Sequence, residues 1–182
     1  EIILELKEEL GFDADVQIID PKIKEEEARR NSFATTYWSA RQRRGISLLD
    51  AQKLMRERNY FAAMMVNEGE ADALVTGHSR SYPSVVKPML QLIDKAQGAS
   101  LIATTNMMMT SRGPMFLSDT AININPSADD LAKIAIMTAK TAKMFGVEPV
   151  IAMVSYSNFG SSTNDSAAKV REAVSYLHKN HP

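Results

Sequence analysis

The sequence predicts an α/β fold with mostly parallel strands, and two observations support that prediction. Short apolar runs of the kind found in strands alternate along the chain with longer segments of helical periodicity. One of these runs, residues 150–155, is apolar at almost every position, as in a strand buried on both faces. Strands that alternate with helices indicate parallel βαβ units joined by right-handed crossovers.

The first half of the chain is expected to be mainly helical. The first helix places Ile2, Leu6 and Leu10 near one face and stops at Gly11. Further along, Ser47 opens a capping box, which marks the start of another helix. Predicted helices cover residues 1–10, 23–43, 47–58, 60–68 and the stretch from 83, and predicted strands cover 16–19 and 71–76.

The second half is expected to contain three strands and two helices. Ser127 opens a second capping box, and Gly146 ends the helix that follows it. We place a boundary at Gly98, between a partial first α/β domain (1–97) and a partial second one (98–182), because a helix ends there and two strands follow. Predicted strands cover residues 100–109, 115–118 and 150–155, and predicted helices cover 127–145 and 163–178.

Composition and charge exclude several classes of protein. The 182 residues carry 21 Lys plus Arg against 22 Asp plus Glu, and a net charge of −1 argues against a nucleic-acid partner or a polybasic membrane anchor. Without any Cys there is no disulfide, thiolate nucleophile or Cys-ligated metal. No apolar run is long enough for a membrane span and no signal peptide opens the sequence, so we expect a cytoplasmic protein. Because the first residue is Glu, we expect a piece of a longer protein.

Two polar, glycine-containing junctions follow predicted strands, which is where open parallel sheets bind ligands. The first, residues 76–83, offers Ser79, Arg80 and Ser81 just before a predicted helix. Free N–H groups at a helix N-terminus attract anions, and an arginine adds a charge that can bind an anion in bidentate fashion. Simple capping of the next helix explains the same residues equally well.

The second junction, residues 155–163, follows the strand of buried type. Small hydroxyl residues around Gly160, including Ser157 and Ser161, would let a phosphate approach the backbone closely. The segment is neither a Walker loop nor a dinucleotide-binding fingerprint. Taken alone, it is more simply interpreted as a capped turn.

Other residues with chemical potential have ordinary structural explanations. Arg43 and Arg44 fit a solvated helix end. His178 and His181 lie near the chain end without a carboxylate nearby, so no metal site is expected there. Asp119 follows a predicted strand, and either catalysis or turn formation would explain it.

Several stretches of sequence form a joint pattern across nearly the whole chain. They are residues 61–77, residues 116–123, residues 152–157 followed by Gly160 and Ser161, and Arg41 upstream of residues 45–48. Together they resemble the phosphate acetyl/butyryl transferase family. The resemblance implies a three-layer α/β/α architecture of the isocitrate/isopropylmalate-dehydrogenase type, with two domains and a cleft between them.

Residues 76–83 and 108–115 are similar to the C-terminal phosphotransacetylase-like domain of bacterial NADP-dependent malic enzymes. In those enzymes a separate N-terminal module, with NADP and a divalent metal, converts malate to pyruvate, carbon dioxide and NADPH. The resemblance implies that the appended domain binds acetyl-CoA or acetyl phosphate and regulates the enzyme. It implies no cofactor, metal or catalytic residue in this chain, because the family's Ser-Arg and Asp catalytic elements would lie beyond residue 182.

In the transferases of this family, arginines hold the phosphoryl group while the CoA thiolate attacks acetyl phosphate. The resemblance maps one of these arginines onto Arg41 and another onto Lys87, and lysine keeps the charge but loses the planar bidentate geometry. We therefore expect this chain to bind a small anionic metabolite rather than to transfer acetyl groups. The residues expected to bind it are Arg41, Ser79, Arg80, Ser81, Lys87, Ser157, Gly160 and Ser161.

Two alternatives belong to other functional classes. One is an active phosphate acetyltransferase, which makes acetyl phosphate from acetyl-CoA and phosphate. The other is an oligomerisation module, suggested by the apolar run 107–109 and by the helix at 163–178. Because partial sheets leave edges and apolar faces uncovered, we also expect a homo-oligomer.

Overall fold

The computed structural model describes residues 2–77 and 79–181, with Phe159 described by its backbone only. Contacts divide the chain into two compact units, Glu1–Asp94, here called the helical unit, and Lys95–Pro182, the hairpin unit. Each unit is described by itself. The sequence predicts a domain boundary after residue 97, and the assignment of the two halves as domains stays a prediction. None of the described helices is both long and apolar enough to cross a membrane.

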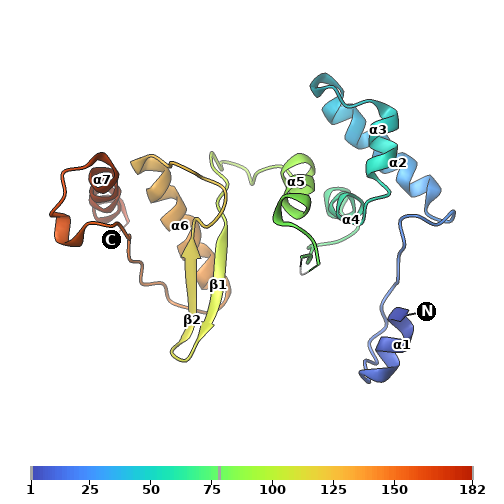
Figure 1. Ribbon diagram of the computed structural model, residues 1–182, viewed down its shortest axis with the longest axis horizontal. Helices are drawn as coiled ribbons and strands as arrows, with labels where there is room; N and C mark the ends of the chain where they lie inside the picture. The colour runs from blue at the N-terminus through green and yellow to red at the C-terminus, as the bar shows by residue number, and fades with distance from the viewer. Residues whose placement is uncertain (1, 78, 182) are drawn as a thin grey trace. The chain divides into compact units, whose positions relative to one another are not determined.

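The helical unit contains the helices that the sequence predicts for the first half of the chain (Figure 1). The capping box at Ser47 is confirmed, because its hydroxyl accepts the Asp50 N–H and the Asp50 carboxylate accepts the Ser47 N–H in return. In chain order the elements are α1 (Ile2–Glu9), α2 (Glu27–Arg41), the 3₁₀ turn η1 (Gln42–Arg44), α3 (Leu48–Leu54), α4 (Arg58–Asn67) and α5 (Tyr82–Leu92).

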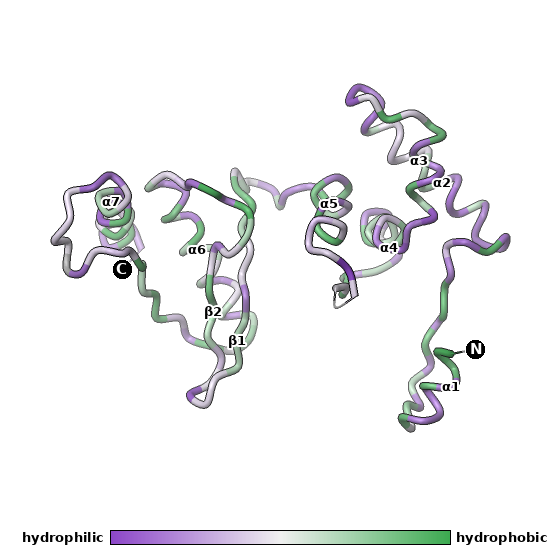
Figure 2. Tube along the Cα trace, in the orientation of Figure 1, coloured by the Kyte–Doolittle hydropathy of each residue, from purple (hydrophilic) through white to green (hydrophobic). Residues whose placement is uncertain are grey.

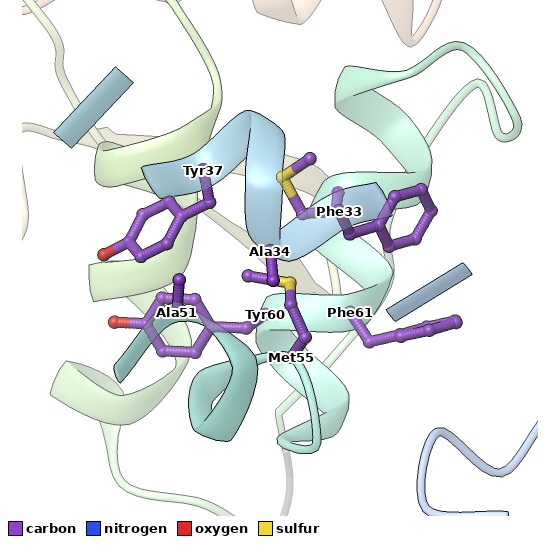
Figure 3. Close-up of a cluster of buried hydrophobic side chains, with 8 residues drawn as sticks. Phe33, Ala34, Tyr37, Ala51, Met55, Tyr60 and Phe61 are labelled. Carbon is purple, nitrogen blue, oxygen red and sulfur yellow. The ribbon is translucent and has the colours of Figure 1, made fainter. Parts of the chain in front are cut away.

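The core of the helical unit is an aromatic and methionine cluster between α2, α3 and α4. Phe33 packs against Phe61 with ring centroids 5.2 Å apart, and Tyr37 meets Tyr60 at 5.9 Å. Figure 3 shows both tyrosine hydroxyls on the same side of the cluster. Trp38, the single tryptophan of the chain, is half-buried against it. The buried members are Phe33, Ala34, Tyr37, Ala51, Met55, Tyr60, Phe61 and Met64.

The hairpin unit contains one described sheet, an antiparallel pair with one helix packed against it and a second helix packed on the first. Strands β1 (Thr105–Thr110) and β2 (Gly113–Ser118) pair in register from Thr105 opposite Ser118 to Thr110 opposite Gly113. Figure 2 shows largely hydrophobic strands and a hydrophilic turn between them. Helix α6 (Ala128–Met144) contacts β2, and α7 (Asp165–Asn180) packs against α6. The capping box predicted at Ser127 is confirmed.

Alanines dominate the buried positions of the hairpin unit. Small side chains let α6 and α7 approach closely, but they bury little apolar surface. Many larger side chains stay exposed, including Val150 at 98% and Met144 at 85%. The buried apolar residues of this unit are Ala132, Ile134, Ala135, Ala142, Ala167 and Ala173.

The α/β class is confirmed, but three of the predicted strands are wrong. Residues 16–19, 71–76 and 150–155 form no strand in the described structure. A strand exists only where a second strand lies beside it, and no such neighbour covers Val75, which is 96% exposed. The described sheet is antiparallel, so the three-layer architecture around mostly parallel sheets, of the isocitrate/isopropylmalate-dehydrogenase type, is not confirmed.

Candidate anion-binding site

Arg41, at the end of α2, reaches the C-terminal end of α5. Its Nε donates to the Gln91 carbonyl oxygen at 3.1 Å and its Nη2 donates to the same oxygen at 2.5 Å. A second carbonyl, that of Leu90, accepts from Nη2 at 3.4 Å. The last carbonyls of a helix carry partial negative charge, so the guanidinium both caps α5 and stabilises its dipole. Lys87 is exposed on α5 one turn before Gln91, on the same side of the helix.

The side chain of Gln91 joins three helices at this point. Its Oε1 accepts hydrogen bonds from the hydroxyls of Tyr37 at 3.0 Å and Tyr60 at 2.8 Å. Burial raises the pKa of Tyr60 to about 12, and the neighbouring Tyr37 adds to the rise. Burial also raises the pKa of Tyr37, against the opposing charge of Arg41. Both tyrosines therefore stay protonated donors at neutral pH, and Arg41 is fixed in a rigid setting.

Asn59 holds the first junction against the start of α5. Pro88 lies inside α5 and has no N–H, so the carbonyl of Ser84, four residues earlier, loses its helical donor. The buried Asn59 replaces that donor, because its Nδ2 donates to the Ser84 carbonyl at 3.2 Å. Its Oδ1 accepts from the Thr76 hydroxyl at 2.9 Å. One amide thus satisfies a carbonyl that proline leaves unpaired and fixes the start of the loop.

The loop itself presents Ser79, Arg80 and Ser81 on the surface. Ser81 is the N-cap residue of α5, but its side chain does not accept a backbone N–H there and instead donates to the Ser84 hydroxyl at 3.2 Å. The capping interpretation is therefore correct in that Ser81 occupies the N-cap position of α5. It is wrong in that the Ser81 side chain does not cap the helix. His78 lies outside the described residues.

The second junction, residues 155–163, is here called the serine loop, and it is held together by its own hydroxyl groups. The Ser157 hydroxyl accepts the Ser162 N–H at 3.0 Å and lies 3.4 Å from the Ser161 hydroxyl. The Ser155 hydroxyl accepts the Ser157 N–H at 3.1 Å. The loop leads through the 3₁₀ turn η2 (Asn158–Gly160) to α7, where Asn164 caps the helix.

Arg171 of α7 lies against the serine loop, a contact that the sequence analysis does not predict. Its Nη1 donates to the carbonyls of Gly160 at 3.0 Å and Ser162 at 2.8 Å. Gly160 has a positive φ of 72°, and a Cβ at this position would lie 3.4 Å from the Arg171 guanidinium. Glycine is favoured here by the left-handed turn, since a Cβ would make only ordinary contact with the arginine. Arg171 gives the loop a local positive charge.

Asp119 organises the loop after β2, which favours the turn-forming explanation over the catalytic one. Its carboxylate accepts from the backbone N–H groups of Thr104 at 2.9 Å and Asn123 at 2.7 Å, and from the hydroxyl of Thr104 at 2.5 Å. Burial would raise the pKa of Asp119, but these hydrogen bonds outweigh burial and hold the pKa well below its usual range. The Asn123 side chain also ties the loop to the Ile102 carbonyl at 2.9 Å.

The structure brings some of the predicted site residues together within each unit. In the helical unit, Arg41 meets α5 one turn from Lys87, while Arg80 lines a separate cavity with arginines from the start of α4. In the hairpin unit, Ser157, Gly160 and Ser161 form one loop. A single crevice that joins both loops stays a prediction, as does the anion-binding role of each residue.

Sequence reasoning missed the residues that position these loops. Only Asn59 had a usable signal, because a proline inside a helical segment predicts an unpaired carbonyl four residues earlier that some buried donor must satisfy. Gln91 acts through partners far away in sequence, and Arg171 through loop residues nine and eleven positions earlier, so no helical or strand spacing marks either one. Among the described residues, no three His, Cys, Asp or Glu side chains gather as metal ligands would.

Comparison with known proteins finds relatives named phosphate acetyltransferase and NADP-dependent malic enzyme. It is 35% identical over 167 residues to a phosphate acetyltransferase of Synechocystis sp., a match covering 92% of this chain and 24% of that protein. It is also 32% identical over 180 residues to the NADP-dependent malic enzyme of Escherichia coli, covering 98% of this chain and 23% of that protein. The crystal structure of a phosphotransacetylase from Streptococcus pyogenes matches with a TM-score of 0.76 and 36% identity, over 97% of this chain and 54% of that one.

Each of these matches covers nearly the whole of this chain. The chain spans about a quarter of the length of the Synechocystis and E. coli proteins. The family described as "Phosphate acetyl/butaryl transferase" matches residues 2–182, nearly the whole sequence. This agreement confirms the family resemblance and an α/β fold like that of phosphotransacetylases, and the chain belongs to the phosphate acetyl/butaryl transferase family.

Proposed function

We propose that this phosphotransacetylase-like chain binds an acyl-CoA or acyl phosphate and thereby regulates an NADP-dependent malic enzyme, without transferring acetyl groups itself. The observation that supports this is the engagement of Arg41 by α5. Two of its guanidinium nitrogens, Nε and Nη2, already donate to backbone carbonyls of α5, so the side of the guanidinium that they form is occupied and does not face a phosphoryl group. Lys87, the neighbouring cation, is a point charge that can attract an anion but lacks bidentate geometry.

The serine loop supplies the features needed for binding. Its clustered hydroxyls can donate to phosphoryl oxygens, and Arg171 supplies positive charge beside them. Helix α7 begins immediately after the loop, with the positive end of its dipole directed to the same place. These contacts favour an anion in the ground state, which is what an effector requires.

The test uses the full-length protein that contains this chain. We expect acetyl-CoA to change the rate of malate oxidation. In Lys87→Gln, the acetyl-CoA concentration needed for half of this effect should rise about tenfold, because a charged contact is removed. Lys24→Gln, an exposed lysine before α2, is the matched control and should leave the response unchanged. If acetyl-CoA and acetyl phosphate neither bind nor alter malate oxidation, the regulatory proposal is wrong.

A second candidate is an active phosphate acetyltransferase, and it is favoured by relatives that carry that name. In this reaction the CoA thiolate attacks the acetyl carbonyl carbon of acetyl phosphate, the bond to the phosphate oxygen breaks, and phosphate leaves. The full-length protein would then form acetyl-CoA from acetyl phosphate and CoA, and Arg41→Ala would lower kcat. Absence of turnover in the full-length protein, with binding intact, would exclude this candidate.

A further inference from the structure

The helical unit contains a cavity of about 340 Å³ lined by three arginines. Arg56 and Arg58 flank the residue that precedes α4, and Arg80 comes from the loop between α4 and α5. The family resemblance points to neither Arg56 nor Arg58. The fold thus brings Arg80, which the sequence suggests as an anion ligand, to a cavity that two other guanidinium groups share.

Positive charge predominates around this cavity. Lys22 adds a fourth cation, against two carboxylates, those of Asp20 and Glu57. The Asp20 carboxylate accepts the Lys22 backbone N–H at 2.9 Å. None of the ion pairs found among the described residues engages one of the three arginines. Helix α4 also begins here, at Arg58, so the positive end of its dipole adds to the same field.

Part of the cavity wall is apolar. It is formed by Ile18, Ile19 and Pro21, with Ile3 of α1 beside them. An inorganic anion would gain nothing from such a wall, whereas a ligand that joins several phosphates to a flat ring would use both surfaces. The volume lies at the lower end of the range typical of small-molecule sites.

We propose that this cavity binds the diphosphate end of a nucleotide, with the arginines on the phosphates and the isoleucines against the base. Arginine suits this ligand because its planar donors match phosphate oxygens in pairs. CoA carries a nucleotide diphosphate, so the inference deepens the proposed function and rests on it. The site would hold the end of the ligand that does not react.

Calorimetric titration of the chain with ADP, pyrophosphate, phosphate and adenosine tests the proposal. We expect ADP to bind most tightly, followed by pyrophosphate, with phosphate and adenosine much weaker. Arg56→Gln and Arg58→Gln should each weaken ADP about tenfold, the loss typical of one charge-assisted hydrogen bond. Arg43→Gln, an exposed arginine of η1 that does not line the cavity, is the matched control and should bind ADP normally.

Two results of the ADP titration would overturn the inference. One is that ADP binds no more tightly than phosphate. The other is that Arg43→Gln loses as much ADP affinity as Arg56→Gln and Arg58→Gln, which would mean that general positive charge attracts the ligand. The result for acetyl-CoA separates this inference from the proposed function. If acetyl-CoA binds and its affinity is unchanged in Arg56→Gln, the cavity assignment fails and the function stands. If ADP binds with the expected ranking while acetyl-CoA has no effect on malate oxidation, the regulatory function fails and the cavity stands.

Discussion

The helical unit and the hairpin unit bury their apolar residues to very different extents. In the helical unit, large side chains such as Phe61 and Met64 are 2% exposed or less. In the hairpin unit the buried set is mostly alanine, and Val150 and Val154 are 98% and 85% exposed. Helices complete a core with neighbours that follow soon in the chain, whereas a sheet needs strands that pair over long sequence distances. The difference predicts that equivalent substitutions in the two units have unequal costs.

The largest effect is expected when one apolar side chain is truncated in each unit and the two losses of stability are compared. Phe61→Ala should lower the free energy of unfolding of the helical unit by about 3–5 kcal/mol, because it leaves a cavity among packed rings. Val154→Ala, which removes apolar atoms from an exposed site, should change the stability of the hairpin unit by less than about 0.5 kcal/mol. Urea unfolding followed by far-UV circular dichroism measures both. A large loss in Val154→Ala would mean that this side chain is covered in solution.

The Asp119 loop tests whether polar contacts, rather than packing, hold the hairpin unit together. Asp119→Asn should cost about 1–3 kcal/mol, because an amide directs a donor at N–H groups that need acceptors. Amide hydrogen exchange at Thr104 and Asn123 should become faster. Asp94→Asn, at an exposed carboxylate of the helical unit, is the control and should leave these amides unchanged.

The same carboxylate gives a pH dependence with a definite sign. Because the folded state lowers the pKa of Asp119, its contribution to stability is complete above the pKa of the unfolded chain, about 4. That contribution is lost as the pH falls below that value. The protection factor of the Asn123 amide, which compares its exchange rate with that of an unstructured amide at the same pH, should therefore fall in acid in the wild type. This fall should be smaller in Asp119→Asn.

The fold could be predicted from the sequence wherever the signal is local. Both capping boxes, at Ser47 and Ser127, are present because their hydrogen bonds join residues three apart. The strand predicted at 150–155 is wrong, because an apolar pattern indicates burial but does not specify the neighbouring strand that a sheet needs. The same limit applies to the site. The capping of α5 by Arg41 joins residues that are distant in the chain, and so does the cavity that Arg80 lines together with Arg56.

A smaller effect is expected from the proline in α5. Asn59→Ala should cost about 0.5–1.5 kcal/mol, because it removes the side-chain donor of the part-buried hydrogen bond to the Ser84 carbonyl. In a Pro88→Ala background the new N–H can donate to that carbonyl, so the same Asn59→Ala change should cost less. A double-mutant cycle on the free energy of unfolding measures the difference. Equal costs in both backgrounds would show that Asn59 acts through Thr76 alone.

The smallest expected effect concerns alkaline pH and only the helical unit. The folded pKa of Tyr60 is raised to about 12, above the ordinary value near 10. Its contribution to stability is therefore complete below pH 10 and is lost as the pH rises toward 12. Tyr60→Phe should reduce the alkaline loss, measured as the change in melting temperature between pH 9 and pH 11. An unchanged alkaline loss in this variant would assign the effect to another group.

The position of Trp38 gives the molecule a built-in optical label. It is the only indole in the sequence, and it is half-buried against the cluster formed by α2, α3 and α4. Its fluorescence therefore reports the packing of the helical unit. Emission spectra recorded during unfolding, set beside a signal that averages all helices, would reveal whether the two halves of the chain lose their structure in a single step or one after the other.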